Sequence, residues 1–162
     1  MTMGPEERAA LVARYAAGAG VFEAAVTGLS DAELDARPFP GEWTVREIAH
    51  HLADGELNSA VRLRRLIAED EPVLAGYDEM AFSRRLHYGE RPIAASVAAM
   101  RAARDATLTI LERLSVAEWA RTGTHTEQGP YSVEAWLRDY ASHPHEHADQ
   151  ARRVLEAVRA GR

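Results

Sequence analysis

Four long segments of this chain repeat their apolar residues at the spacing of an α-helix, and this pattern constrains the fold most strongly. We find no strand-like alternation of apolar and polar residues of any length and no internal repeat. The 162 residues are enough for one domain, spanning 1–162, with a substantial core. We therefore predict an all-α fold, a four-helix bundle. Its helices are expected at about residues 5–29, 44–69, 92–114 and 132–159.

Capping boxes mark where one of these long helices and two short helices begin. In residues 44–47, the Thr44 hydroxyl can accept a hydrogen bond from the Glu47 backbone, and the Glu47 side chain can reach back. Residues 30–33 and 115–118 have the same form and predict two short helices. Pro92 suits the first turn of the third long helix, because its missing N–H is not needed there.

Two connections between helices are expected to be largely irregular. Residues 70–91 contain Pro72, Gly76 and Gly89, with Pro92 directly after them, and predict an irregular stretch with one short helix near 78–86. This stretch is long for a plain connector, so we expect a lid or a pocket wall. Residues 123–130 are predicted to be a loop.

The clearest functional pattern is a pair of histidines, His143 and His147, in the fourth helix. Residues four apart lie on one face of a helix, so both imidazoles can bind one metal ion. A third imidazole from a neighbouring helix, such as His51, would complete the set. Three histidines leave a coordination position open for water or substrate, as catalytic metal sites do.

Helical geometry separates these histidines from their neighbours. The pair in the fourth helix falls on one stripe with Trp136 and Tyr140, whereas His145 falls on the opposite side. In the second helix, His51 lies at the margin of the apolar stripe and can face inward. His50 lies nearly opposite the centre of that stripe, so we expect it to face solvent.

The same residues allow a simpler interpretation, in which the histidines are hydrogen-bonded core or surface residues without a metal. Pro144 stands between the paired histidines and removes one helical hydrogen bond. We expect it to interrupt and kink the fourth helix and to release the Tyr140 carbonyl. His87 and His125 lie in predicted loops, and nothing in the sequence places them near the other three.

Composition excludes several functions. The chain has no cysteine, so it has no disulfide, no thiolate ligand and no cysteine nucleophile. All 19 basic residues are arginine, which excludes a Schiff-base or P-loop lysine. The net charge is −6 with no basic face, so nucleic acid is not an expected partner. We find neither a signal-peptide pattern nor a stretch apolar enough to span a bilayer, and we expect a cytoplasmic protein.

Two segments resemble the DinB/YfiT-like family, which includes thiol-dependent S-transferases. Residues 41–54 are similar to the family's tryptophan, capping box and histidine-containing helix, and residues 143–150 are similar to its paired histidines followed by glutamine. The resemblance implies an up-down-down-up bundle with His51, His143 and His147 as the metal ligands. It also implies a divalent ion such as zinc or nickel, a small-molecule substrate and often a homodimer.

Three functions agree with such a site. The resemblance favours transfer of a low-molecular-weight thiol of the bacillithiol type to an electrophilic small molecule, and without cysteine in the chain this thiol has to be a cosubstrate. A metal-dependent hydrolase of a small amide or ester is the alternative enzyme. It needs a carboxylate base, for which Asp54 is the better-placed candidate and Glu56 the second. The third alternative is a metal-binding stress or structural protein without turnover.

Overall fold

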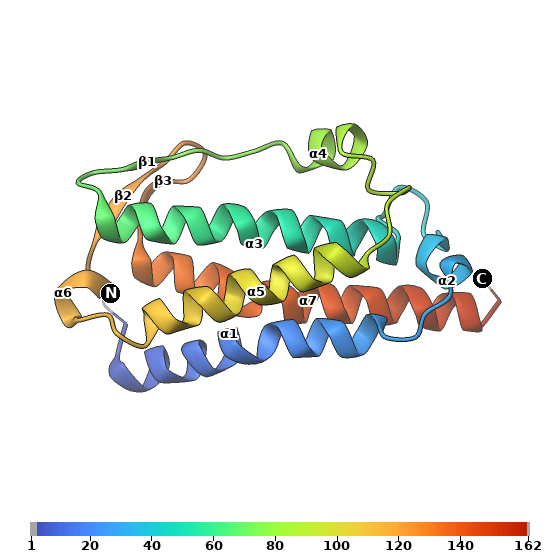
Figure 1. Ribbon diagram of the computed structural model, residues 1–162, viewed down its shortest axis with the longest axis horizontal. Coiled ribbons are helices and arrows are strands. Elements are labelled where there is room, and N and C mark those ends of the chain that lie inside the picture. Colours follow the sequence, from blue (N-terminus) through green and yellow to red (C-terminus); the bar gives the residue numbers. More distant parts are fainter. Residues whose placement is uncertain (1–2, 162) are drawn as a thin grey trace.

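Four long helices form the body of the molecule in the computed structural model, which describes residues 3–161. In Figure 1, α1 and α7 run in one direction along the long axis, and α3 and α5 run in the other. The predicted four-helix bundle and its up-down-down-up order are therefore confirmed. The ends of the predicted domain, residues 1, 2 and 162, lie outside the described residues. The long helices are α1 (Pro5–Val26), α3 (Val45–Ala68), α5 (Ala94–Leu111) and α7 (Val133–Arg159).

The predicted capping boxes are present and start their helices. Thr44 precedes α3. Its hydroxyl accepts a hydrogen bond from the Glu47 backbone N–H, and its own backbone N–H donates to the Glu47 carboxylate. Two short helices begin in the same way: α2 (Asp31–Asp35) and α6 (Val116–Trp119). The placement of Pro92 in the first turn of a helix is wrong, because α5 begins at Ala94.

The connection between α3 and α5 contains the expected short helix, α4 (Glu79–Arg85), which Asp78 caps. Before α4, the chain adds a two-residue strand, β1 (Val73–Leu74). Figure 1 shows this whole connection running along the outside of α3. Its position covers one side of the bundle near the middle of α3.

The prediction of a loop over residues 123–130, without any strand, is wrong. The chain forms a hairpin of β2 (Thr122–His125) and β3 (Gly129–Ser132), and β1 pairs in parallel with β2. The strands have no recognisable alternation because each is four residues or shorter. Their pairing depends on the approach of two segments that are distant in sequence, which periodicity cannot detect.

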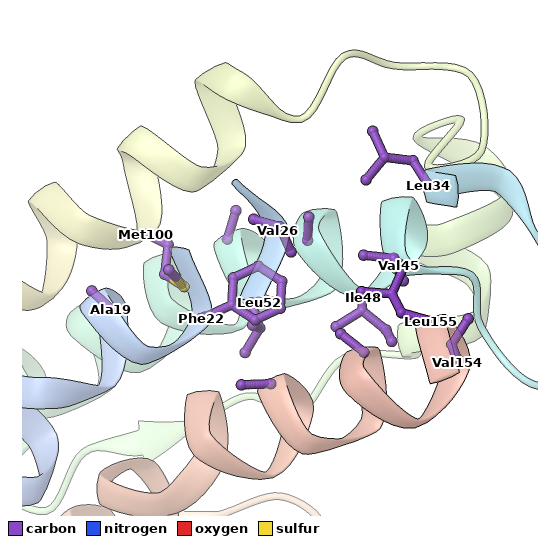
Figure 2. Close-up of a cluster of buried hydrophobic side chains, with 14 residues drawn as sticks. Ala19, Phe22, Val26, Leu34, Val45, Ile48, Leu52, Met100, Val154 and Leu155 are labelled. Atoms are coloured by element: carbon purple, nitrogen blue, oxygen red, sulfur yellow. The ribbon is translucent and has the colours of Figure 1, made fainter. Parts of the chain in front are cut away.

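The core lies between the four long helices and forms two clusters of buried side chains. The first, shown in Figure 2, brings Phe22 of α1 against Leu52 of α3 and Met100 of α5. The second surrounds Tyr15 and Trp136, whose rings lie 5.4 Å apart. Both ends of the bundle are therefore held by apolar burial, and the histidines of interest lie between or beside these clusters.

The expectation that no segment is apolar enough to span a bilayer is wrong for α1. α1 is long and apolar enough by composition to cross a bilayer, with a mean hydropathy of 1.3 in its best window. Here it packs against α7 and α5, and it buries Tyr15, Ala19 and Phe22. The alanine-rich composition of a bundle helix accounts for the apolar score.

Candidate metal centre

Helix α3 carries His51 to the inner side of the bundle. The Thr44 capping box sets the start of the helix, and His51 follows two turns later with only 2% of its surface exposed. Trp43, just before the cap, lays its ring 4.4 Å from the His51 ring. The capped helix start and this aromatic contact together fix the position of the imidazole.

Helix α7 carries His143 and His147, and it continues through Pro144. The predicted interruption is therefore wrong. The proline still leaves the Tyr140 carbonyl without its helical donor, as expected, and Arg104 of α5 donates to that carbonyl at 3.2 Å. The interior arginine thus supplies the hydrogen bond that the helix itself lacks at this turn.

The three histidines converge. One nitrogen from each of His51, His143 and His147 can be chosen so that all three lie within 4.8 Å of one another. The Nε2 atoms of His51 and His143 are 3.2 Å apart. Two nitrogens bound to one zinc ion at about 2.0–2.1 Å stand roughly 3.3 Å apart in a tetrahedron. The spacing of this pair therefore fits a shared ion.

The protonation states also suit metal ligands. Burial, with a smaller contribution from nearby His147, lowers the pKa of His51 to about 3. Burial and the two neighbouring histidines lower the pKa of His143 to about 2. Burial is also the main cause that lowers the pKa of His147. All three rings are therefore neutral at physiological pH, which is the form that binds a metal ion.

An outer hydrogen bond orients the ring of His147. The Gln150 side-chain oxygen lies 2.8 Å from Nδ1 of His147, so that nitrogen carries the proton and Nε2 is left available as a ligand. The nearest carboxylate oxygen to His51 belongs to Glu79 of α4, 4.0 Å from Nδ1. The Nδ1 atoms of His51 and His143 are buried without a hydrogen-bond partner among the described residues.

Gly55 of α3 leaves the space that His143 occupies. A Cβ atom at this position would stand 3.2 Å from Cε1 of His143 and 3.6 Å from the Tyr77 hydroxyl. The approach of the two helices at the histidine site therefore depends on a residue without a side chain.

A cavity of about 220 Å³ opens beside His143. It lies between α3, α4, α7 and the β2–β3 hairpin, so the connection that we expected to be a lid or a pocket wall does contribute to one. Neither Glu79 nor His125 could be placed here from the sequence, because both lie outside the long helices and no periodic signal marks them. The residues that line the cavity include Arg62, Tyr77, Glu79, His125, Glu127 and Tyr140.

The other histidines lie away from the cluster. The prediction that His50 faces solvent is wrong: it is 1% exposed, and its ring nitrogens lie 2.7 Å from the Ser96 hydroxyl and 3.0 Å from the Arg91 carbonyl. Helical periodicity misplaces His50 because α5 and the segment just before it cover that side of α3 as well. His145 points away from the cluster toward the Arg14 carbonyl, at 2.9 Å.

The two carboxylates proposed from sequence have other partners. Asp54 accepts a hydrogen bond from the Tyr88 hydroxyl and does not line the cavity. Glu56 is fully buried in an ion pair with Arg104. Burial raises the pKa of Glu56, and the adjacent guanidinium counteracts that rise. Glu56 therefore belongs to the core, whereas Glu79 is the carboxylate beside the histidines.

Comparison with known proteins agrees with this architecture. Residues 14–151 match the model of the DinB superfamily. The chain is 34% identical to "Putative metal-dependent hydrolase OB0782" of Oceanobacillus iheyensis, over 75% of this chain and 70% of that protein. It is 30% identical to "Putative metal-dependent hydrolase YfiT" of Bacillus subtilis, over 76% and 70% of the two chains.

The fold of a solved relative is also similar. The structure of Bacillus subtilis YfiT, described as "a probable metal-dependent hydrolase with an unusual four-helix bundle topology", superposes with a TM-score of 0.90 at 25% identity. The match covers 99% of this chain and 91% of that one. Fold and site together define a class of helical bundles with three histidines gathered beside a cavity. Within that class, this chain belongs to the DinB superfamily.

Proposed function

We propose that this protein is a metal-dependent enzyme that binds one divalent ion, zinc or nickel, through His51, His143 and His147. The convergence of three neutral imidazoles beside a cavity carries the proposal. A divalent ion held by neutral ligands acts as a Lewis acid and lowers the pKa of a bound thiol or water. The chain's own residues hold the three rings neutral, orient His147 through Gln150, and admit a small molecule beside His143.

We propose further that the nucleophile is the thiol of a small cosubstrate, of the bacillithiol type, and that it attacks an electrophilic small molecule. The absence of cysteine means that the sulfur has to come from outside the chain. The likeness of the sequence motifs to thiol-dependent members of the family supports this choice. A cavity with charged groups of both signs suits a hydrophilic cosubstrate.

Hydrolysis of a small amide or ester is the second candidate, because the named relatives are described as hydrolases. Such a reaction needs a carboxylate that accepts a proton from water. Glu79 fits this role better than Asp54, because it lines the cavity and approaches His51 to 4.0 Å. Burial and the negative charge of Glu127 raise the pKa of Glu79, which makes it a better proton acceptor.

Elemental analysis of the dialysed, untagged protein tests the metal centre, with His51→Ala as the variant and His145→Ala as the matched control. We expect about one ion per chain in the wild type and in the control, and none in His51→Ala. No metal in the wild type after zinc and nickel have been offered would remove the basis of both enzyme proposals.

The loaded enzyme is then assayed with and without a low-molecular-weight thiol. Joint loss of thiol and electrophile supports the transferase, whereas release of an acid without thiol supports the hydrolase. Metal binding without either reaction, together with a large loss of thermal stability on chelation, would favour a structural or stress-related metal protein. A cytoplasmic location, a homodimer and the absence of a nucleic-acid or membrane partner stay proposals from the sequence.

A further inference from the structure

His125, which lines the cavity beside the metal centre, has an unused hydrogen-bond donor. Its ring is 3% exposed and lines the cavity. The backbone N–H of Glu127 donates to its Nδ1 at 3.3 Å, so the ring proton is on Nε2. That Nε2 is buried and has no hydrogen-bond partner among the described residues. A buried donor left unpaired costs about 1–3 kcal/mol, so its presence needs an explanation.

The imidazole of His125 remains a neutral donor. Burial lowers its pKa, and the positive charge of Arg62 lowers it further. A neutral Nε2–H group binds an oxygen acceptor, such as a carbonyl or carboxylate, without requiring a counter-ion. The ring is held in place by the short β2–β3 turn, because residues 125 and 127 are joined by the hydrogen bond just described.

The same cavity carries an excess of negative charge. Glu79, Glu127 and Asp139 line it, against the single lining cation Arg62 among the described residues. Arg62 already donates to the Ala75 carbonyl and to the Tyr140 hydroxyl. The Glu127 carboxylate has no ion-pair partner among residues 3–161, and it fills the space beside Gly76 that a Cβ atom would otherwise occupy. The proposed divalent ion beside His143 would offset two of these three negative charges, so the preference for a cationic group rests on the carboxylate of Glu127.

We propose that this cavity recognises the head group of the substrate, and that the head group is a small cationic amine with a neighbouring carbonyl or carboxylate oxygen. His125 Nε2 donates to the oxygen, and Glu127 faces the amine. The volume of about 220 Å³ suits a fragment of aminoacyl size. The proposal rests on the proposed function, because His143 places the bound fragment beside the metal centre.

The test uses L-alaninamide as the probe and lactamide, its uncharged hydroxyl analogue, as the matched control ligand. Binding to metal-loaded protein is followed by NMR through the imidazole C–H resonances. We expect L-alaninamide to shift the His125 resonance and lactamide to bind at least about tenfold more weakly. Equal binding of the two ligands, or no binding of L-alaninamide at all, would overturn the proposal.

Three variants assign the contacts. His125→Leu should weaken L-alaninamide binding by about tenfold, while His125→Gln, whose amide can replace the Nε2–H donor, should retain most of it. Glu127→Gln should weaken the amine probe and leave lactamide unchanged. Glu112→Gln, an exposed change at the C-cap of α5, should alter neither. If His125→Leu and His125→Gln bind the probe as well as the wild type does, the assignment of His125 is wrong.

The metal content of each variant separates this proposal from the proposed function. We expect His125→Leu and Glu127→Gln to keep their metal, because neither residue belongs to the three-histidine cluster. Turnover of substrates without any preference for an amine would overturn the head-group proposal and leave the enzyme proposal intact. Binding of L-alaninamide by a protein that catalyses neither reaction would support the head-group proposal and overturn the enzyme proposal.

Discussion

Replacing Arg104 with methionine should destabilise the fold severely, because its guanidinium satisfies several buried groups at once. Arg104 is 1% exposed and pairs with the fully buried carboxylate of Glu56. It also donates to the Tyr15 carbonyl at 2.7 Å and to the Tyr140 carbonyl at 3.2 Å. Gly18 provides the space for this side chain, since a Cβ there would lie 2.9 Å from a guanidinium nitrogen.

The magnitude follows from what the substitution leaves behind. Removing one partner of a buried ion pair costs about 3–5 kcal/mol, because the remaining charge is buried without compensation. The Tyr140 carbonyl loses a donor that Pro144 cannot replace, which adds about 1–3 kcal/mol. We therefore expect Arg104→Met to lower the free energy of unfolding by about 4–8 kcal/mol at neutral pH.

The loss should depend on pH in a defined direction. Without Arg104, burial outweighs the hydrogen bonds from Ser59 and Tyr15 and raises the pKa of Glu56 further above the ordinary value of 4.5. A carboxyl group with a raised pKa in the folded state contributes its stability below the unfolded pKa and loses it as the pH rises through the folded pKa. The deficit of Arg104→Met relative to wild type should therefore be smaller in mildly acidic buffer than in alkaline buffer.

Urea unfolding of the metal-free protein, followed by the fluorescence of the buried Trp136, measures this loss. The double variant Glu56→Leu/Arg104→Met removes both charges and should recover most of the stability, leaving the cost of about 1–3 kcal/mol at the Tyr140 carbonyl. Arg101→Met breaks a more exposed ion pair and should cost no more than about 1 kcal/mol. The reasoning is refuted if Arg104→Met costs no more than Arg101→Met, or if the double variant is no more stable than the single one.

Three further predictions concern the metal centre. His147→Ala should abolish stoichiometric metal binding measured by calorimetry, whereas His145→Ala should retain it; equal losses would show that the two faces of α7 have been assigned wrongly. Gln150→Leu should weaken metal affinity by about 10–100-fold, because His147 loses the acceptor that orients it; an unchanged affinity would exclude that role. Gly55→Ala should weaken metal binding, because the added Cβ would contact the neighbouring imidazole of α7. Gly20→Ala is the matched control: its nearest neighbour is 3.7 Å away, so this change should leave metal binding unchanged and stabilise α1 by about 0.5–1 kcal/mol. Equal metal affinities in the two variants would contradict the packing argument.

The fold could largely be read from local sequence signals. The four long helices follow from 3.6-residue periodicity, and the Thr44, Ser30 and Ser115 capping boxes locate three helix starts because both hydrogen-bonding partners lie within four residues. The meeting of His143 with His147 follows from helical geometry in the same way. The order of the helices in space and the inclusion of His51 came from family resemblance, since periodicity does not say which helices are neighbours.

Local sequence signals could not predict contacts between segments that are distant in sequence. The β2–β3 hairpin has strands too short for a periodic signal, so its assignment as a loop was wrong, and His125 could not be placed in the cavity. His50 was wrongly assigned to the surface, because the apolar stripe of α3 marks one buried face and cannot reveal a second one covered by a polar partner such as Ser96.

Sequence by itself therefore determined the helices, their caps and the two histidines on one face of α7, because these depend on interactions within a turn or two of the chain. Tertiary structure alone decided that Arg104 reaches the carbonyl released by Pro144, that Glu79 rather than Asp54 stands beside the histidines, and that a cavity opens there. Each of these depends on the distance between side chains far apart in sequence, which packing of the whole bundle sets.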